Sequence, residues 1–349
     1  MFKIQSYSVS DNFFAARNSH DGFKSLFTSV FSPKKYVKIF ILKGGPGTGK
    51  STLLRGIISF ANETMIDAKA ILCSSDINSL DGVILTQNNQ SIAIIDGTAP
   101  HTVDPIYPGA VEEIINLGDG FNIKALEERR QEIFYHSHEK KVAYQKAYSV
   151  LLSSKSIFDY IWNELKNSAL YNEAEDIAKQ IFNVDKTNNL NEKNDVKLYS
   201  SFGKNGQYSL SPNHGYNPLN LVGNEFLCSM ILDAVSKSCV NNKIPQNRYS
   251  SALDDRMAER LLFGETVIVC NQNLPERTVI GQYDMGKYCR EFERIYNNYT
   301  SLLKIAQLYF GEASSSHFAL EKIYSEAVDF SFNDRIYTNL CDRIYNILL

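Results

Sequence analysis

Short apolar segments and amphipathic segments alternate along the first hundred residues. Residues 36–43 (YVKIFILK) are nearly continuously apolar and contain several β-branched side chains, which predicts a strand buried on both faces. Residues 50–62 carry Leu and Ile along one face at helical spacing, which predicts an amphipathic helix. Further strands are predicted at residues 68–73 and 91–95, with a short extra strand at 80–85 between them. This alternation indicates an α/β fold in which a doubly wound parallel sheet has helices on both faces.

The pattern changes at residue 121. Residues 121–182 contain neither Gly nor Pro and are dominated by helix formers, which predicts two or more long helices. Residues 183–195 are mostly polar, and we expect a linker or an exposed loop there.

The rest of the chain repeats the plan of the first half in weaker form. A strand at residues 219–222, a helix at 225–238 and a strand at 265–270 are predicted, and the chain is again helical from residue 288. We therefore predict two domains, residues 1–190 with a long helical extension and residues 196–349 as a repeat with a helical C-terminus. An unrelated helical domain with the same amphipathic spacing is the alternative.

One glycine-rich segment follows the first predicted strand. Residues 44–51 read GGPGTGKS and match the phosphate-binding P-loop pattern G-x-x-x-x-G-K-[ST], between a strand and a helix as that motif requires. Glycines let backbone N–H groups turn toward phosphate oxygens, and the N-terminus of the following helix favours the same anion. The residues expected to hold the nucleotide are Gly45, Pro46, Gly47, Thr48, Gly49, Lys50, Ser51 and Thr52. Lys50 would reach the β- and γ-phosphates, Ser51 would ligate Mg²⁺, and Thr52 would touch the α-phosphate.

A second Mg²⁺ ligand is expected at the end of a neighbouring apolar strand. The segment SIAIID places Asp96 at that position, and we assign Asp96 to the metal; the alternative is a strand-ending Asp that begins a turn. Many ATP-hydrolysing motors carry Glu directly after this Asp to polarise the attacking water, whereas Gly97 follows here. The base that activates the water must therefore come from another part of the chain, or the protein does not hydrolyse ATP rapidly.

Polar residues after the predicted strands supply further candidates. Asp76 follows the second strand, where many P-loop kinases place the base that accepts the substrate proton; an Asx turn or a helix cap is the alternative. His101 and Asp104 follow Asp96 at the carboxyl end of a strand, where ligands bind in open α/β sheets. Asp81 precedes a glycine and is expected to be a turn residue.

Two further groups of charged residues are expected to have structural roles. Glu112 and Glu113 are expected to begin a helix, because acidic residues in a first turn favour the helix dipole. Arg129 and Arg130 are expected on solvated helix faces, with an arginine that reaches the γ-phosphate as the alternative.

Composition narrows the class of protein. The chain has 349 residues, 44% of them hydrophobic, and a formal net charge of −3, which is typical of a globular protein and argues against nucleic acid as a partner. The six cysteines form no C-x-x-C pair, so we expect reduced thiols. The sequence shows neither a signal peptide nor a run of about 18 apolar residues, which predicts a cytoplasmic protein without a membrane span. The absence of an N-K-x-D guanine-reading motif favours ATP over GTP.

Three segments together resemble one protein family. FILKGGPGTGKSTLL, CSSDINSLDGV and AIIDGTAPHTVDPIYPGAVEEIINLG are similar, in this order and spacing, to segments of a poorly characterised family of Gram-positive bacterial P-loop proteins. Members are labelled ATPases on the strength of the motif and look like two tandem P-loop units. The resemblance covers residues 7–185 well and the rest loosely. It implies motif positions at Lys50, Ser51, Asp76, Asp81, Asp96 and His101.

The second half departs from this two-unit pattern. LVGNEF at residues 221–226 lacks the glycines, the lysine and the hydroxyl of a P-loop, and VIVCN at residues 267–271 lacks the Asp. We therefore predict a degenerate second unit that cannot bind a triphosphate by the usual means.

The leading hypothesis is an ATP-binding P-loop NTPase that hydrolyses Mg·ATP at a single site, slowly or on demand. The catalytic candidates are Lys50, Asp96, Asp76 and His101. One alternative is a small-molecule or nucleotide kinase that uses Asp76 as base on an unknown acceptor. Another is an ATP-gated interaction protein with an unknown protein partner.

Overall fold

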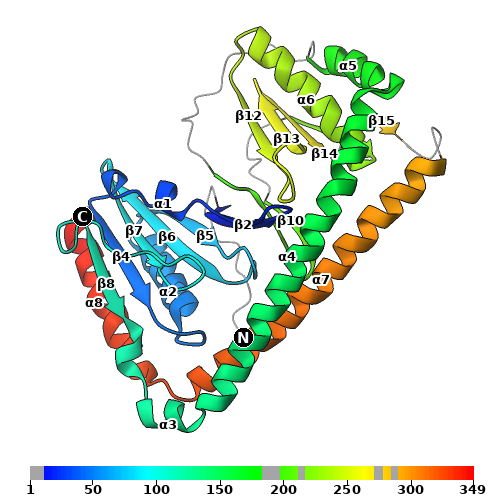
Figure 1. The fold of residues 1–349 in the computed structure, drawn as a ribbon. Coiled ribbons are helices and arrows are strands. Elements are labelled where there is room, and N and C mark those ends of the chain that lie inside the picture. Colours follow the sequence, from blue (N-terminus) through cyan, green and yellow to red (C-terminus); the bar gives the residue numbers. More distant parts are fainter. Residues whose placement is uncertain (1–11, 183–196, 211–216, 271–277, 284–289) are drawn as a thin grey trace. The chain divides into compact units, whose positions relative to one another are not determined.

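The chain folds into two compact units in a computed structural model that describes residues 12–182, 197–210, 217–270, 278–283 and 290–349. Unit 1 comprises residues up to 17, residues 23–146 and residues 308–349, and unit 2 comprises residues 18–22 and 147–307. Each unit contains its own sheet and its own helices, as Figure 1 shows. The predicted α/β class is confirmed.

Unit 1 contains a six-stranded sheet in the order β1-β5-β6-β7-β4-β8. These strands are β1 (Phe13–Phe14), β4 (Lys38–Lys43), β5 (Asp67–Leu72), β6 (Leu80–Gln87), β7 (Gln90–Asp96) and β8 (Glu112–Asn116). β6 runs antiparallel to both of its neighbours, whereas the other neighbouring strands are parallel. The prediction of a parallel sheet is therefore wrong at β6. Asn88 and Asn89 have φ values of 51° and 62°, which suit the tight turn of a hairpin between antiparallel strands.

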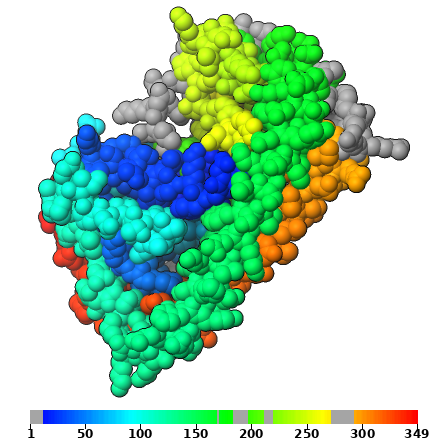
Figure 2. Space-filling view, in the orientation of Figure 1, coloured from blue at the N-terminus to red at the C-terminus, as the bar shows by residue number. Residues whose placement is uncertain are grey.

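The core of unit 1 lies between this sheet and two helices. The predicted apolar face of α2 (Lys50–Glu63) is confirmed, since Leu54 and Ile57 are fully buried. The last helix of the chain, α8 (Phe330–Leu348), inserts Leu340 and Ile344 into the same hydrophobic cluster. In the space-filling view, residues at the red end of the colour scale lie beside the cyan residues of this sheet (Figure 2).

Several short elements accompany the six-stranded sheet. They are α1 (Phe27–Val30), η1 (Pro33–Lys35), η2 (Leu117–Gly120), α3 (Ile123–Glu128) and a two-stranded sheet of β2 (Ala16–Ser19) and β3 (Gly22–Ser25), whose residues are divided between the two units. Glu112 and Glu113 begin the strand β8 and not a helix. The Glu112 carboxylate accepts hydrogen bonds from the amides of Ile106 and Tyr107, which closes the preceding turn. Glu113 forms a two-pronged ion pair with Arg343 of α8, at 2.7 and 2.5 Å.

Two long helices contribute to both units, which explains why the units are not continuous in sequence. These helices are α4 (Arg130–Lys166) and α7 (Arg290–Ser325). At 37 residues, α4 is about 55 Å long, which exceeds the width of one small domain. The units therefore do not follow the expected division into residues 1–190 and 196–349. The linker expected at residues 183–195 lies outside the described residues.

Unit 2 contains a five-stranded sheet in the order β12-β13-β14-β11-β15. Its elements are α5 (Ala169–Phe182), β9 (Ser200–Gly203), β10 (Gly206–Ser209), β11 (Asn217–Gly223), α6 (Glu225–Asn241), β12 (Gln246–Ser250), β13 (Ala258–Phe263), β14 (Thr266–Cys270) and β15 (Thr278–Tyr283). β9 and β10 form a separate hairpin. The strands predicted at residues 219–222 and 265–270 and the helix between them are confirmed.

The sheet of unit 2 matches five strands of unit 1 in order and direction. The series β12-β13-β14-β11-β15 corresponds to β5-β6-β7-β4-β8. In each series the second strand is antiparallel to both neighbours, and the remaining neighbours are parallel. In each unit a helix also follows the fourth strand of the series directly, α2 after β4 and α6 after β11. The two units therefore share one sheet topology.

The packing of α8 generates a stability prediction. Leu340 is fully buried in the core of unit 1, so Leu340→Ala should lower the free energy of unfolding of that unit by about 2–5 kcal/mol. Chemical denaturation, combined with hydrogen exchange of the β4 and β7 amides, measures the change. Asn339→Ala, on the exposed side of the same helix, is the control and should change stability by about 0.5 kcal/mol or less. If Leu340→Ala lost hydrogen-exchange protection only in β11 and β14, the assignment of α8 to unit 1 would be contradicted.

Candidate functional site

The loop between β4 and α2, residues 44–49, has a backbone shape that requires glycine. Gly47 and Gly49 adopt φ values of 70° and 83°, in the left-handed region that side chains disfavour. Gly49 is also the N-cap of α2, so the loop passes directly into the helix N-terminus. The Thr48 hydroxyl donates to the carbonyl of Gly45 at 2.9 Å, which closes the loop from within. This segment is called the glycine-rich loop below.

Lys50 is folded back over the glycine-rich loop. Its ammonium group donates hydrogen bonds to the carbonyls of Gly44 and Gly45 at 2.9 and 2.7 Å. Its Nζ also lies 3.7 Å from Oδ2 of Asp96. Burial lowers the pKa of Lys50, and the negative charge of Asp96 opposes that effect. A positive charge is therefore held, half-buried, at the N-terminus of α2.

Two oxygen-bearing side chains suited to a hard cation lie at the end of β7 and at the start of α2. Asp96 ends β7, and its Oδ1 accepts hydrogen bonds from the amide and the hydroxyl of Thr98 at 2.9 and 2.5 Å. Ser51, in the first turn of α2, accepts a hydrogen bond from the amide of Leu80 at 3.1 Å. Carboxylate and hydroxyl oxygens are ligands that Mg²⁺ accepts together with water and phosphate. Within the described residues, no group of three or more His, Cys, Asp or Glu side chains could hold a metal ion by itself.

His101 and Asp81 are brought together in the interior. Asp81 lies within β6, so its interpretation as a turn residue is wrong. It faces His101, with 3.4 Å between Oδ2 and Nε2, and both side chains are about 6% exposed. The imidazole also stacks on Phe27 at a ring separation of 4.4 Å. This enclosure places His101 between the sheet and the α1 segment, away from solvent.

Asp76 lies on the surface of the β5–β6 connection. Its carboxylate accepts a hydrogen bond from the amide of Asn78 at 3.0 Å, which is the geometry of an Asx turn. The side chain is exposed, and its negative charge acts on His317 of α7. Asp76 is therefore within electrostatic range of the groups that surround Lys50.

The other sequence candidates lie in exposed ion pairs. Asp104 is 80% exposed and lies 3.2 Å from Lys43, whose ammonium also holds the carbonyls of Gly97 and Val103. Arg129 pairs with Glu132 and Glu326 at 2.8 and 2.6 Å. Arg130 lies 3.9 Å from Glu127. The alternative of an arginine directed at the γ-phosphate receives no support from these contacts.

Three groups that the sequence did not single out surround Lys50. Burial, together with the positive charges of Lys140 and Lys50, lowers the pKa of His317 to about 4. Burial also lowers the pKa of Lys140 on α4, an effect that Glu321 opposes and Lys50 reinforces. Glu321 lies one helical turn from His317, with 3.5 Å between Oε1 and Nε2. Electrostatic interactions therefore connect Lys50, Lys140 and Glu321 near the loop. These residues come from α2, α4 and α7.

The C-terminal helices also contact the loop directly. A side chain at Gly47 would meet the Glu321 carbonyl oxygen at 2.2 Å, so α7 passes close to the loop backbone. Asn333 of α8 is buried and donates a hydrogen bond to the carbonyl of Thr48 at 2.8 Å. The loop is therefore held from three sides, by β4, α7 and α8.

Comparison with family models, curated proteins and solved structures found no match for this chain. In the part of the chain that the structure describes, no helix combines the length and the apolar character that a membrane crossing requires. The function is therefore argued from the residues of the loop and its surroundings.

Proposed function

We propose that unit 1 binds Mg·ATP at the glycine-rich loop and hydrolyses its terminal phosphate. The observation that supports this proposal is the position of Lys50, whose ammonium group donates to the carbonyls of Gly44 and Gly45 and lies 3.7 Å from the Asp96 carboxylate. A triphosphate in the loop would replace these weak partners with charged oxygens and would accept the N–H groups at the start of α2. On this proposal unit 1 is a P-loop NTPase domain, and the family resemblance of its motifs remains a prediction.

Ser51 and Asp96 are the residues that would hold Mg²⁺ in this site. Asp96 directs Oδ1 to Thr98, which fixes the carboxylate and leaves Oδ2 toward Lys50 and the loop. The metal would neutralise charge between the β- and γ-phosphates. Lys50 would then move from the loop carbonyls to the phosphates.

The water-positioning group is assigned to Glu321. Gly97 follows Asp96, so the strand provides no carboxylate next to the metal ligand. The negative charge of Glu321 acts on both Lys50 and Lys140, and its carboxylate lies 3.5 Å from His317, which supports this assignment. Lys140 would stabilise the negative charge that develops on the transferred phosphate.

A kinase is the second candidate function. The exposed carboxylate of Asp76 acts on His317, so it lies near the same cluster while remaining open to an acceptor molecule. An acceptor hydroxyl would then take the place of water, and Asp76 would receive its proton.

Unit 2 is proposed to be a degenerate copy of the same fold. Its sheet topology repeats that of unit 1, but a single residue, Asn224, connects β11 to α6 where unit 1 has six residues of loop. No cradle of backbone N–H groups is available in this connection. A triphosphate is therefore expected in unit 1 alone.

Removal of the Lys50 charge should weaken ATP binding. Lys50→Ala deletes a charge-assisted contact worth about 1.5–3 kcal/mol, which corresponds to an increase in Kd of roughly 10- to 150-fold. Calorimetric titration with Mg·ATP measures the change. Lys38→Ala, a lysine on β4 that pairs with Glu113 at 3.3 Å, is the matched control and should bind ATP like the parent. Equal affinity of Lys50→Ala and the parent for ATP would show that the glycine-rich loop is not the ATP site.

Two carboxamide variants should separate hydrolysis from phosphoryl transfer. Glu321→Gln should leave ATP affinity within a few-fold and should lower the rate of acceptor-independent phosphate release by about 10²–10⁴. Asp76→Asn should leave that rate unchanged under the hydrolase proposal. If Asp76→Asn abolishes turnover, and turnover in the parent requires an added metabolite extract, the kinase candidate replaces the hydrolase.

A further inference from the structure

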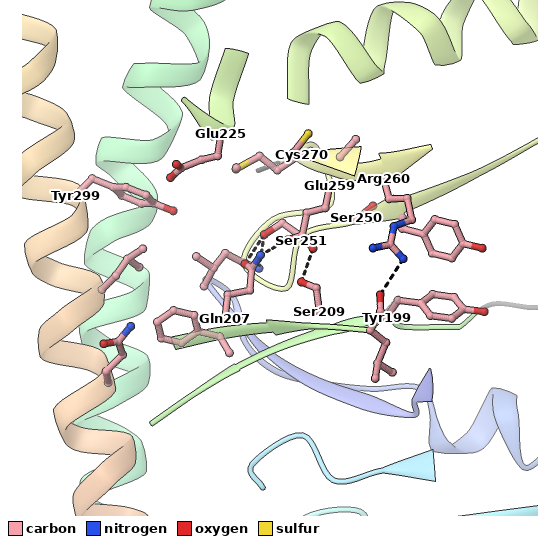
Figure 3. A pocket seen from close by; sticks show the side chains of 18 residues that line it. Tyr199, Gln207, Ser209, Glu225, Ser250, Ser251, Glu259, Arg260, Cys270 and Tyr299 are labelled. Atoms are coloured by element: carbon pink, nitrogen blue, oxygen red, sulfur yellow. Dashed lines mark hydrogen bonds between the residues drawn. The ribbon is translucent and has the colours of Figure 1, made fainter. Parts of the chain in front are cut away.

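Unit 2 contains a partly open cavity of about 500 Å³, which is large enough for a small organic molecule (Figure 3). Four aromatic side chains line it together with polar and charged groups. The aromatic residues are Tyr199, Phe202, Tyr249 and Tyr299. The charged residues are Glu225, Glu259 and Arg260. All of these residues belong to unit 2, so the cavity is formed within a single unit.

The cavity lies where unit 1 has its glycine-rich loop. In the described residues, the last pair between β4 and β7 is Leu42 with Asp96, and the last pair between β11 and β14 is Leu221 with Cys270. Cys270 therefore ends its strand as Asp96 ends β7, and it lines the cavity. The first residue of the helix after the fourth strand is Lys50 in unit 1 and Glu225 in unit 2.

The neighbouring strand extends this correspondence. In unit 1, Asp81 precedes Gly82, which pairs with Ile95 beside the end of β7. In unit 2, Glu259 precedes Arg260, which pairs with Val269 beside the end of β14. Asp81 and Glu259 therefore each lie near the end of the adjacent strand. In place of the lysine and the metal-binding carboxylate, unit 2 has a glutamate and a thiol. The charge that the helix N-terminus presents is inverted from positive to negative.

Both cavity carboxyl groups are held by neutral donors. Glu259 accepts hydrogen bonds from Ser209 at 2.6 Å and from Gln207, as Figure 3 shows. Glu225 accepts a hydrogen bond from Tyr296 at 2.8 Å. Among the described residues, no Lys, Arg or His forms an ion pair with either carboxyl group within 4.0 Å.

Burial opposes the negative charge of both groups. It raises the pKa of Glu225, and it raises the pKa of Glu259 to about 7, although the nearby Arg260 charge acts in the opposite direction. The Cys270 thiol, whose pKa is well above its usual value, and the Tyr299 phenol, whose pKa is also raised, remain neutral. Within the described residues, neither acidic group of this aromatic-lined cavity has an ion-pair partner within 4.0 Å that would stabilise its ionised form.

We propose that this cavity binds a small organic cation, an amine or a guanidine, whose charged group pairs with Glu259 and Glu225. The aromatic rings would cover the apolar part of the ligand and would favour the cation through their π faces. A phosphate-bearing ligand is disfavoured, because the loop is missing and the helix N-terminus carries a glutamate. Unit 2 would then be a ligand sensor or a substrate site. This proposal does not depend on ATP binding in unit 1.

The test uses the full-length protein and three defined probes. Tyramine and agmatine are the cationic probes, and 4-ethylphenol is the neutral counterpart of tyramine. Calorimetric titration should show that at least one of the two amines binds. If tyramine binds, its affinity should be at least tenfold higher than that of 4-ethylphenol. Because Glu259 has a pKa of about 7, its ionised fraction rises from roughly one tenth at pH 6 to nine tenths at pH 8. Amine affinity should therefore increase about tenfold over this range.

Glu259→Gln should weaken amine binding tenfold or more and should remove its pH dependence. Glu265→Gln, a matched change at an exposed turn of the same unit, should leave both unchanged. If Glu259→Gln fails to fold, two measurements on the parent still test the proposal. These are the pH dependence of amine affinity and the comparison of tyramine with 4-ethylphenol. Failure of both amines to bind, or equal binding of 4-ethylphenol and tyramine, would overturn the proposal.

Discussion

The parallel pairing of β4 with β7 determines the geometry on which the candidate site depends. Its register sets Leu42 opposite Asp96, so the strand that leads into the glycine-rich loop ends beside the strand that ends in a carboxylate. The left-handed glycines then return the chain into α2, which brings Lys50 to within 3.7 Å of Asp96. A slip of one residue in this register would move Asp96 to the opposite face of the sheet. The C-terminal helices add Asn333 and Glu321 to an arrangement that the two strands have already defined.

The same pairing of strands recurs in unit 2 with different side chains at its end. Leu221 and Cys270 form the last described pair there, as Leu42 and Asp96 do in unit 1, and a single residue, Asn224, connects β11 to α6. The glutamate that begins α6 inverts the local charge, and the surrounding residues leave a cavity lined by tyrosines. The fold is common to both units, whereas the function depends on a few side chains at one edge of each sheet.

The sequence predicted those features that depend on local patterns. The strand, glycine-rich segment and helix at residues 38–63 are local signals, and they lie where the sequence predicted them. The antiparallel direction of β6 was missed because Asn88 and Asn89 form a hairpin turn without glycine. Lys140, His317 and Glu321 were missed because long amphipathic helices look alike in sequence, and only tertiary packing selects the face that meets Lys50. Glu259 was missed because β12 and β13 give weak strand patterns in a polar stretch.

The most direct test of this account is the number of Mg·ATP molecules that one chain binds. We expect one triphosphate site in unit 1 and none in unit 2, since the described residues of unit 2 contain no counterpart of the glycine-rich loop and Lys50. Calorimetric titration of the full-length protein should therefore give a stoichiometry of one. Replacement of residues 44–49 by a single asparagine, the connection found in unit 2, should reduce it to zero. Two sites per chain, or one site that survives this replacement, would contradict the account.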